Sequence, residues 1–126
     1  MKVYGVGTDI IEVGRIAAAI EKNGAFKKKV YTSSEIKYCE SKAKSKYPSY
    51  AARFAAKEAV AKSLSEGVGK NVSLSEIELS HTDRGAPFVI LHGGTFKYSR
   101  KLGIKEIKIS VSATKNFSVA FAISFI

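Results

Sequence analysis

The spacing of apolar residues changes from helical to alternating near residue 70. Before that point, apolar positions three to four residues apart predict helices over residues 12–23, 32–42 and 50–65. After it, alternation predicts strands over residues 74–80, 88–91, 105–111 and 117–126, with a short helix over 96–102. A glycine-containing strand over residues 3–10 precedes them all. This order predicts an α+β domain, with a mostly antiparallel sheet packed on a long central helix.

Local sequence signals set the ends of these elements. Thr32 and Glu35 have the spacing of a capping box, so a helix is expected to start there. Pro48 disfavours a helical conformation at Tyr47, and Ser49 is expected to cap the long helix that follows. Residues 82–87 contain Gly and Pro between two strands and predict the turn of a hairpin.

The last strand is apolar on both of its faces. Val119, Phe121, Ile123 and Phe125 alternate with Ala120, Ala122 and Ile126. A strand that is apolar on both faces in a small domain predicts burial on both faces. Here we expect one of those faces to contact a second subunit.

Length and charge narrow the class of protein. The 126 residues suit one domain, which we assign to residues 1–126. Lys and Arg total 21 against 11 Asp and Glu, and a net charge of +10 predicts an anionic partner. The lone Cys39 excludes a disulfide within the chain and fits a reducing compartment. The apolar run from Val119 to Ile126 is too short to span a bilayer, so we expect a cytoplasmic protein without a membrane partner.

The Ala-rich stretch from Arg53 to Lys62 contains a candidate functional stripe. Residues four apart share a helix face, so Phe54, Glu58 and Lys62 lie in one row. One interpretation is an exposed Glu–Lys pair that adds little stability. The other is a pair of partly buried groups that require polar partners elsewhere in the chain.

Asp9 is a second candidate, because it follows two glycines in the first strand. Gly5 and Gly7 allow another backbone or a ligand to come close. The pattern is not a dinucleotide fingerprint, since Ile10 stands where a third glycine is required. Asp9 has two interpretations: the N-cap of the next helix, or a carboxylate that holds a cation.

Two blocks together resemble a known family. Residues 5–16 (GVGTDIIEVGRI) and 53–62 (RFAAKEAVAK) resemble the signature blocks of the holo-[acyl-carrier-protein] synthases, the small bacterial-type 4′-phosphopantetheinyl transferases. Residues 85–88 and 110–115 resemble two further blocks in the right order, so the resemblance covers the whole chain. It implies the 4′-phosphopantetheinyl transferase fold, a homotrimer with active sites between subunits, and a role in fatty acid biosynthesis.

The resemblance also implies a reaction and its residues. The 4′-phosphopantetheine group of coenzyme A would be transferred to a serine of an acidic acyl carrier protein, releasing adenosine 3′,5′-bisphosphate. Asp9 and Glu58 match the Mg²⁺ ligands of the family, and Lys62 matches the lysine near the departing phosphate. Either Glu58 or a water on the metal would accept the serine proton. Coenzyme A contacts are implied for Lys44, Lys46, Arg53, Gly85, Pro87, Ser112 and Thr114, and carrier contacts for Arg15, Lys22, Phe26 and Lys28.

Two positions depart from the family pattern. Ala113 stands where many members have a histidine, which predicts a weaker contact with the 3′-phosphate of the nucleotide. Ser65 stands where the family favours glycine, and we expect only a local adjustment there. A small basic nucleic-acid-binding domain is the main alternative to a transferase, although it would leave Asp9 and Glu58 without a role.

Overall fold

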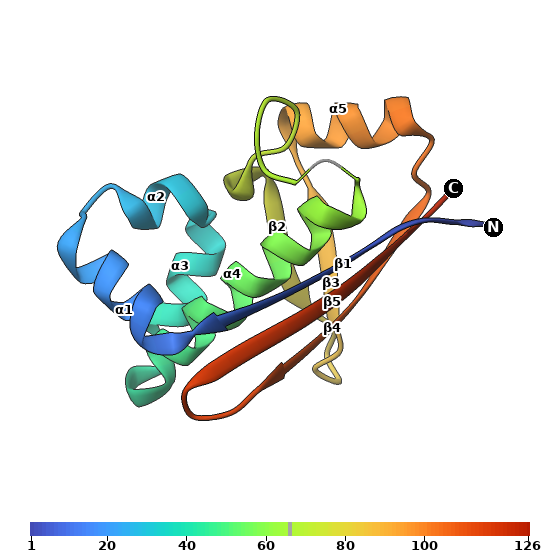
Figure 1. Cartoon of the computed structure of the whole chain (residues 1–126). Helices are drawn as coiled ribbons and strands as arrows, with labels where there is room; N and C mark the ends of the chain where they lie inside the picture. Colours follow the sequence, from blue (N-terminus) through green and yellow to red (C-terminus); the bar gives the residue numbers. More distant parts are fainter. Residues whose placement is uncertain (66) are drawn as a thin grey trace.

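The computed structural model describes residues 1–65 and 67–126. Every strand pair is antiparallel, and the longest helix, α4, contacts both sheets (Figure 1). The predicted α+β class with antiparallel strands is therefore confirmed. The elements in chain order are β1 (Val3–Glu12), α1 (Val13–Lys22), α2 (Phe26–Val30), α3 (Ser33–Glu40), η1 (Ala43–Ser45), α4 (Lys46–Ser63), η2 (Leu74–Glu76), β2 (Ile77–His81), β3 (Pro87–Leu91), α5 (Gly93–Leu102), β4 (Glu106–Ala113) and β5 (Phe117–Phe125).

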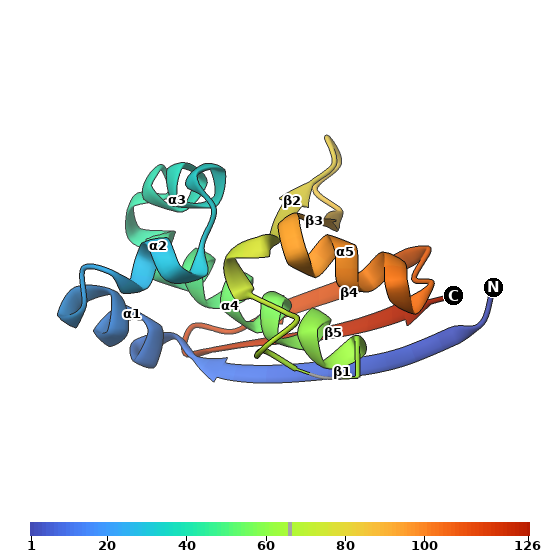
Figure 2. The ribbon, with the colours of Figure 1, turned by 90° about the horizontal axis from the view of Figure 1, so that it is seen from above.

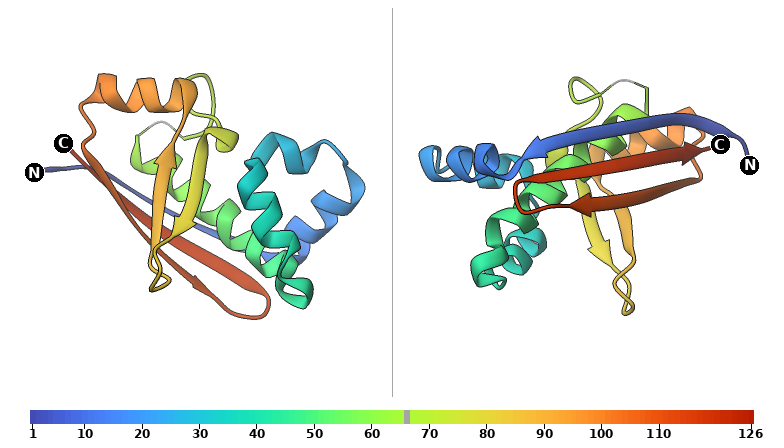
Figure 3. Two further views of the ribbon diagram at one scale, coloured as in Figure 1. Left: turned by 180° about the vertical axis from the view of Figure 1, so that it is seen from behind. Right: turned by 60° about the horizontal axis from the view of Figure 1, so that its bottom comes forward.

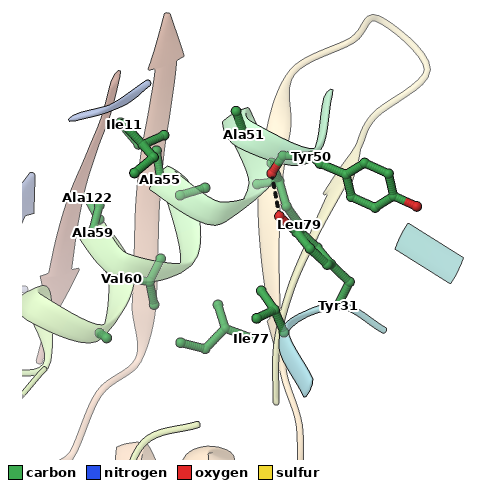
Figure 4. Close-up of a cluster of buried hydrophobic side chains, with 14 of the residues drawn as sticks. Ile11, Tyr31, Tyr50, Ala51, Ala55, Ala59, Val60, Ile77, Leu79 and Ala122 are labelled. Atoms are coloured by element: carbon green, nitrogen blue, oxygen red, sulfur yellow. Dashed lines mark hydrogen bonds between the residues drawn. The ribbon is translucent and has the colours of Figure 1, made fainter. Parts of the chain in front are cut away.

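The core forms where α4 packs on the larger sheet, whose strand order is β1-β5-β4. Ala55 and Ala59 of α4 are fully buried, and Ala122 of β5 lies opposite them (Figure 4). Side chains this small let helix and sheet backbones approach closely. On the other side of α4, Val60 packs with Ile77 and Leu79 of the smaller sheet, β2-β3.

The outer face of the larger sheet is an exposed apolar surface. It carries Val6 and Ile10 of β1, with 57% and 64% of their surface exposed. Phe117, Val119 and Phe121 of β5 lie beside them and are also exposed. The alanine face of β5 is covered by α4 within the subunit. Coverage of this outer face by another subunit stays a prediction.

Several predicted elements are confirmed. Thr32 caps α3 through a full capping box, in which its hydroxyl accepts from the Glu35 N–H and its own N–H donates to the Glu35 carboxylate. β2 and β3 form the predicted hairpin, and its tip projects beyond the larger sheet (Figure 2; Figure 3, right). Both chain ends lie together, joined by hydrogen bonds between Lys2 and Ile126 (Figure 3).

Two boundary predictions were wrong, and one short helix was not predicted. α4 begins at Lys46, so Ser49 lies inside the helix and does not cap it. Pro48 is tolerated because the first helical turn needs no N–H donor at that position. The basic cluster from Phe26 to Val30 forms the short helix α2, an element that the sequence pattern did not predict. α5 begins at Gly93, where the Glu76 carboxylate accepts hydrogen bonds from the N–H groups of Gly94 and Thr95.

Ser65 adopts a left-handed conformation, with φ of 65°, just after α4. Glycine reaches this region at little cost, whereas serine is strained there. The local adjustment expected at this position is therefore a strained backbone.

None of the helices in the described part of the chain is long and apolar enough to cross a membrane.

Candidate active site

Gly7 determines how close β1 lies to α4. A Cβ atom on Gly7 would overlap the carbonyl oxygen of Ala59 and would lie 2.8 Å from the Cβ of Lys62. Asp9 follows two residues later and therefore points to the same face of the strand. The close approach of the two backbones thus brings Asp9 to the part of α4 that carries Glu58 and Lys62.

Asp9 lies within β1 and does not cap a helix. β1 continues to Glu12, which is the N-cap residue of α1. The N-cap interpretation of Asp9 is therefore wrong, because the strand runs longer than the sequence pattern indicates. Its carboxylate instead lies 3.5 Å from the ammonium of Lys62, and this ammonium also donates to the carbonyl oxygen of Thr8 at 2.9 Å.

Glu58 lies one helical turn before Lys62 and is half-buried. Burial and the neighbouring charge of Asp9 raise the pKa of Glu58, while Lys62 opposes this shift. Two carboxylates and one ammonium thus interact across β1 and α4. Asp9 is the polar partner of the Glu58–Lys62 pair, so the interpretation of this pair as partly buried groups with a partner elsewhere in the chain is the one that the structure supports.

Adding a methyl group to Gly7 is expected to damage both stability and the site. Gly7→Ala forces β1 away from α4, and overpacking of this kind costs about 1–3 kcal/mol. The same movement separates Asp9 from Glu58. Urea unfolding measures the stability change, and a transfer assay measures the loss of activity.

Gly14→Ala is the matched control for this variant. Gly14 lies in α1, and an added Cβ there meets no atom within 4 Å. Alanine in a helix is favoured over glycine by roughly 0.5–1 kcal/mol, so this control should be slightly more stable than the wild type. Equal stability of Gly7→Ala and Gly14→Ala would contradict the close packing of β1 on α4.

Arg53 lies on a different side of α4 from Glu58. At 3.6 residues per turn, the step of five residues from Arg53 to Glu58 corresponds to a rotation of about 140°. The Arg53 guanidinium lies 4.2 Å from the centre of the Tyr38 ring, and Arg53 is almost fully buried. Its Nε has no hydrogen-bond partner among the residues that the structure describes. This unpaired donor is unusual for a buried cation and requires a partner.

A pocket of about 190 Å³ lies next to Arg53. It is lined by Ser34, Glu35, Tyr38, Arg53, Glu78, Leu79, Ser80 and His81. Partial burial and the charge of Arg53 lower the pKa of His81, which stacks on Tyr38 at 5.6 Å. A larger pocket of about 480 Å³, formed by β3, α5 and β4, contains none of the predicted site residues.

The remaining residues predicted to contact coenzyme A lie at exposed turns and ends. Lys44 is exposed in η1, whereas Lys46 is held by Glu40 at 3.4 Å. Gly85 occupies the hairpin turn with a φ of 88°, and Pro87 opens β3. Ser112 is exposed within β4, where it pairs with Val119, so the predicted turn does not include it; Thr114 lies in the exposed β4–β5 turn. Within the described residues, no hydrogen bond or ion pair joins these side chains to Asp9, Glu58 or Lys62.

The residues predicted to contact a carrier protein lie on α1 and α2. Arg15, Lys22 and Lys28 are exposed. Phe26 is half-buried and stacks on Phe54 of α4, with ring centres 6.4 Å apart. Phe26 therefore contributes to packing between α2 and α4, and only part of its ring is available to a partner.

A buried ion pair that the sequence pattern did not reveal joins α4 to α3 on another side of the helix. Lys57 contacts the Glu35 carboxylate at 2.6 Å, and neither side chain is exposed by more than 1%. Lys57 also donates to the carbonyl oxygens of Leu74 and Ile77, and Glu35 accepts from the Leu79 N–H. One signal was available: Lys57 shares its helix face with Val60 and Leu64, both of which are apolar and buried.

Comparisons with known proteins relate this chain to one family. A family model described as the 4′-phosphopantetheinyl transferase superfamily matches residues 5–122. A holo-[acyl-carrier-protein] synthase of Ruminiclostridium cellulolyticum is 50% identical over 119 residues, covering 94% of this chain and 89% of that protein. The crystal structure of the holo-[acyl-carrier-protein] synthase from Neisseria meningitidis matches with a TM-score of 0.91 and 31% identity, covering 98% of this chain and 99% of that one. A Bacillus anthracis synthase in complex with CoA (3′,5′-ADP) matches with a TM-score of 0.82 and 32% identity, covering 98% and 97%.

These matches define the class of this protein as a 4′-phosphopantetheinyl transferase. Within that superfamily, the chain belongs to the holo-[acyl-carrier-protein] synthases. The family predicted from the two sequence blocks is confirmed. The comparisons do not support the alternative of a nucleic-acid-binding domain.

Proposed function

We propose that this protein transfers the 4′-phosphopantetheine group of coenzyme A to a serine of apo acyl carrier protein, with Mg²⁺, releasing adenosine 3′,5′-bisphosphate. The reaction would serve fatty acid biosynthesis in the cytoplasm. The observation that carries this proposal is the juxtaposition of Asp9, Glu58 and Lys62 in a chain of this family. The relative from Bacillus anthracis supports the choice of substrate, because it was crystallised with CoA (3′,5′-ADP).

Asp9 and Glu58 have the donor chemistry that suits Mg²⁺. The ion prefers hard oxygen ligands and is usually held by one or two carboxylates, with water and substrate phosphates completing its shell. The two side chains come from β1 and α4, and the charge of Asp9 acts on Glu58. Among the described residues there is no cluster of three or more His, Cys, Asp and Glu that could hold a metal alone. When bound, the ion would neutralise charge on the diphosphate of coenzyme A.

Lys62 would bind the phosphate oxygen from which the phosphopantetheine departs. Its ammonium lies beside the two carboxylates and its side chain is half exposed, so it can reach a diphosphate held there. The serine of the carrier must lose its proton to attack phosphorus. A carboxylate at Glu58 is one acceptor for this proton.

A homotrimer would complete the site. The β2–β3 hairpin with Gly85 and Pro87 projects beyond the sheet of its own subunit (Figure 2). Ser112 is exposed near the end of β4, and Thr114 lies in the turn that follows. These groups would reach the nucleotide bound to a neighbouring subunit. The exposed apolar face of the larger sheet supplies a surface for such an assembly.

Lys44, Lys46 and Arg53 would bind the phosphates of the nucleotide. The Nε of Arg53, which has no partner among the described residues, supports an anion beside it, since a buried N–H donor without an acceptor is destabilising. The lining of its pocket by Tyr38 and His81 offers an aromatic surface next to that anion.

Restoring a histidine at position 113 is expected to strengthen the contact with the 3′-phosphate. Ala113 is exposed at the β4–β5 turn, so Ala113→His introduces an imidazole without displacing a packed group. The Michaelis constant for coenzyme A should fall by about three- to tenfold, the effect of one added hydrogen bond to a charged group. Steady-state kinetics with varied coenzyme A measure this change. An unchanged Michaelis constant would contradict a 3′-phosphate contact at this turn.

High salt is expected to slow association with the carrier protein. Arg15, Lys22 and Lys28 are exposed on adjoining helices of a chain with net charge +10. Such a surface attracts an acidic partner, and raising ionic strength screens the attraction. Stopped-flow experiments measure the association rate constant between roughly 20 and 500 mM NaCl, the range over which salt strongly shortens the reach of the electrostatic attraction. An association rate that is insensitive to salt would exclude steering by these cations.

A mass-spectrometric assay tests the proposed function directly. The protein is mixed with apo acyl carrier protein, coenzyme A and Mg²⁺, and the carrier is examined for the added phosphopantetheine group. The expected result is complete modification with Mg²⁺ and none when the metal is removed by a chelator. No addition in the presence of Mg²⁺ would refute the proposal.

A further inference from the structure

The ammonium of Lys62 lies beside Asp9, one of the two candidate metal ligands. It lies 3.5 Å from the Asp9 carboxylate and donates to the Thr8 carbonyl at 2.9 Å. Glu58 is one turn earlier on the same helix face. A resident positive charge therefore already interacts with both candidate metal ligands.

This position of Lys62 is weakly held. The side chain is half exposed, whereas Asp9 is largely buried, with 19% of its side chain exposed. A lysine has a flexible four-carbon stem and a compact charge, so it can leave one acceptor for another at low cost. An ion pair of this exposure is readily replaced.

We propose that Lys62 competes with the metal ion for Asp9. Lys62 neutralises Asp9 until the ion binds, and binding of the ion then releases Lys62 toward the substrate phosphates. The inference rests on the proposed function, because it assumes a divalent ion at Asp9 and Glu58. Two cations beside one carboxylate repel each other, so each weakens the binding of the other. Binding of the ion and contact of Lys62 with Asp9 therefore oppose each other.

The competition orders the events at the site. While Lys62 contacts Asp9 and the Thr8 carbonyl, two of its three N–H donors are engaged and its charge is partly neutralised. Once it is released, its ammonium is free to contact the diphosphate, and the stripe on α4 keeps it one turn from Glu58. Because coupling between two sites is reciprocal, the factor by which Lys62 weakens metal binding equals the factor by which the metal weakens the contact of Lys62.

Binding of Mn²⁺ to the substrate-free protein tests the inference without measuring transfer. Free Mn²⁺ is followed by electron paramagnetic resonance for the wild type, Lys62→Met, Glu58→Gln and Lys101→Met. Lys101 is an exposed lysine on α5, so Lys101→Met removes the same charge from an element that carries none of the candidate metal ligands. Lys62→Met should bind Mn²⁺ about three- to tenfold more tightly than the wild type, while Lys101→Met should not differ from it.

The other outcomes separate this inference from the proposed function. If Lys62→Met binds Mn²⁺ no more tightly than Lys101→Met, the competition is refuted, while the metal site stands. The metal site itself is refuted if the wild type does not bind Mn²⁺ saturably, or if Glu58→Gln does not weaken that binding. The inference then fails with it.

Chemical labelling of Lys62 distinguishes release from a general effect of charge. The acetylation rate of each lysine is measured by peptide mass spectrometry with and without saturating Mg²⁺. Release from Asp9 should raise the rate at Lys62 severalfold and leave that at Lys101 unchanged. An unchanged rate at Lys62 would show that the ammonium remains on Asp9 when the metal binds, which would overturn the proposal.

Discussion

Glu58→Gln is expected to slow transfer of the phosphopantetheine group by roughly 10²–10³-fold, the usual effect of losing one preorganised charge in an active site. Glutamine keeps the shape of the side chain, so the half-buried position on α4 remains filled. It removes the negative charge that would hold Mg²⁺ together with Asp9. Mass spectrometry of the carrier protein over time measures the rate, and thermal unfolding confirms that the fold is intact.

Glu21→Gln provides the matched control for this substitution. Glu21 is exposed on α1, and it loses the same charge outside the Asp9–Glu58–Lys62 cluster. Its transfer rate should stay within about twofold of the wild type, as for most surface substitutions. If Glu58→Gln modified the carrier as fast as Glu21→Gln, the assignment of Glu58 to the site would be abandoned.

The fold was predictable where one local signal determined each element. The capping box at Thr32 and Glu35 correctly marked α3, because both hydrogen bonds lie within four residues of sequence. Alternation correctly predicted β4 and β5, in which one face is covered by α4. The errors occurred where distant contacts decide the outcome. α5 starts at Gly93 because Glu76, seventeen residues earlier, binds its first N–H groups.

The site was predictable only in part. Gly7 indicated a close approach, and the structure identifies the approaching group as the backbone of α4. Asp9, Glu58 and Lys62 therefore meet within one subunit. Gly85, Pro87, Ser112 and Thr114 could be matched to the family, yet within the subunit they lie on the β2–β3 hairpin and where β4 turns into β5. Their proximity to a nucleotide depends on a second chain, which local patterns cannot position.

Lys57 shows why charge in an alanine-rich helix is hard to interpret. The row through Phe54, Glu58 and Lys62 marks one face of α4 as the candidate site. The adjacent Lys57 lies on another face of α4 and points toward α3 and β2. Its partner Glu35 was assigned only to the capping box of α3, although one carboxylate serves both roles. Glu35 thus joins α3, α4 and β2, and it fixes the rotation of the helix that carries Glu58.

Lys57→Met is expected to lower the free energy of unfolding by about 3–5 kcal/mol, the typical cost of breaking a buried ion pair. The variant would leave the Glu35 carboxylate inside the core with only two N–H donors, from Thr32 and Leu79. It would also remove the donor to the carbonyl oxygens of Leu74 and Ile77. Urea unfolding measures the change, at one fixed protein concentration because association of subunits alters apparent stability.

Lys27→Met and a double variant show whether burial causes this loss. Lys27 also pairs with a glutamate, Glu40 at 3.0 Å, but both side chains are about one-third exposed. Solvent weakens such pairs, so Lys27→Met should cost less than about 1 kcal/mol. Combining Glu35→Gln with Lys57→Met removes both buried charges, and the double variant should be more stable than the two single losses added together. If the losses in unfolding free energy of the two single variants simply add up in the double variant, Lys57 stabilises the protein through packing alone. The ion pair would then not determine the rotation of α4.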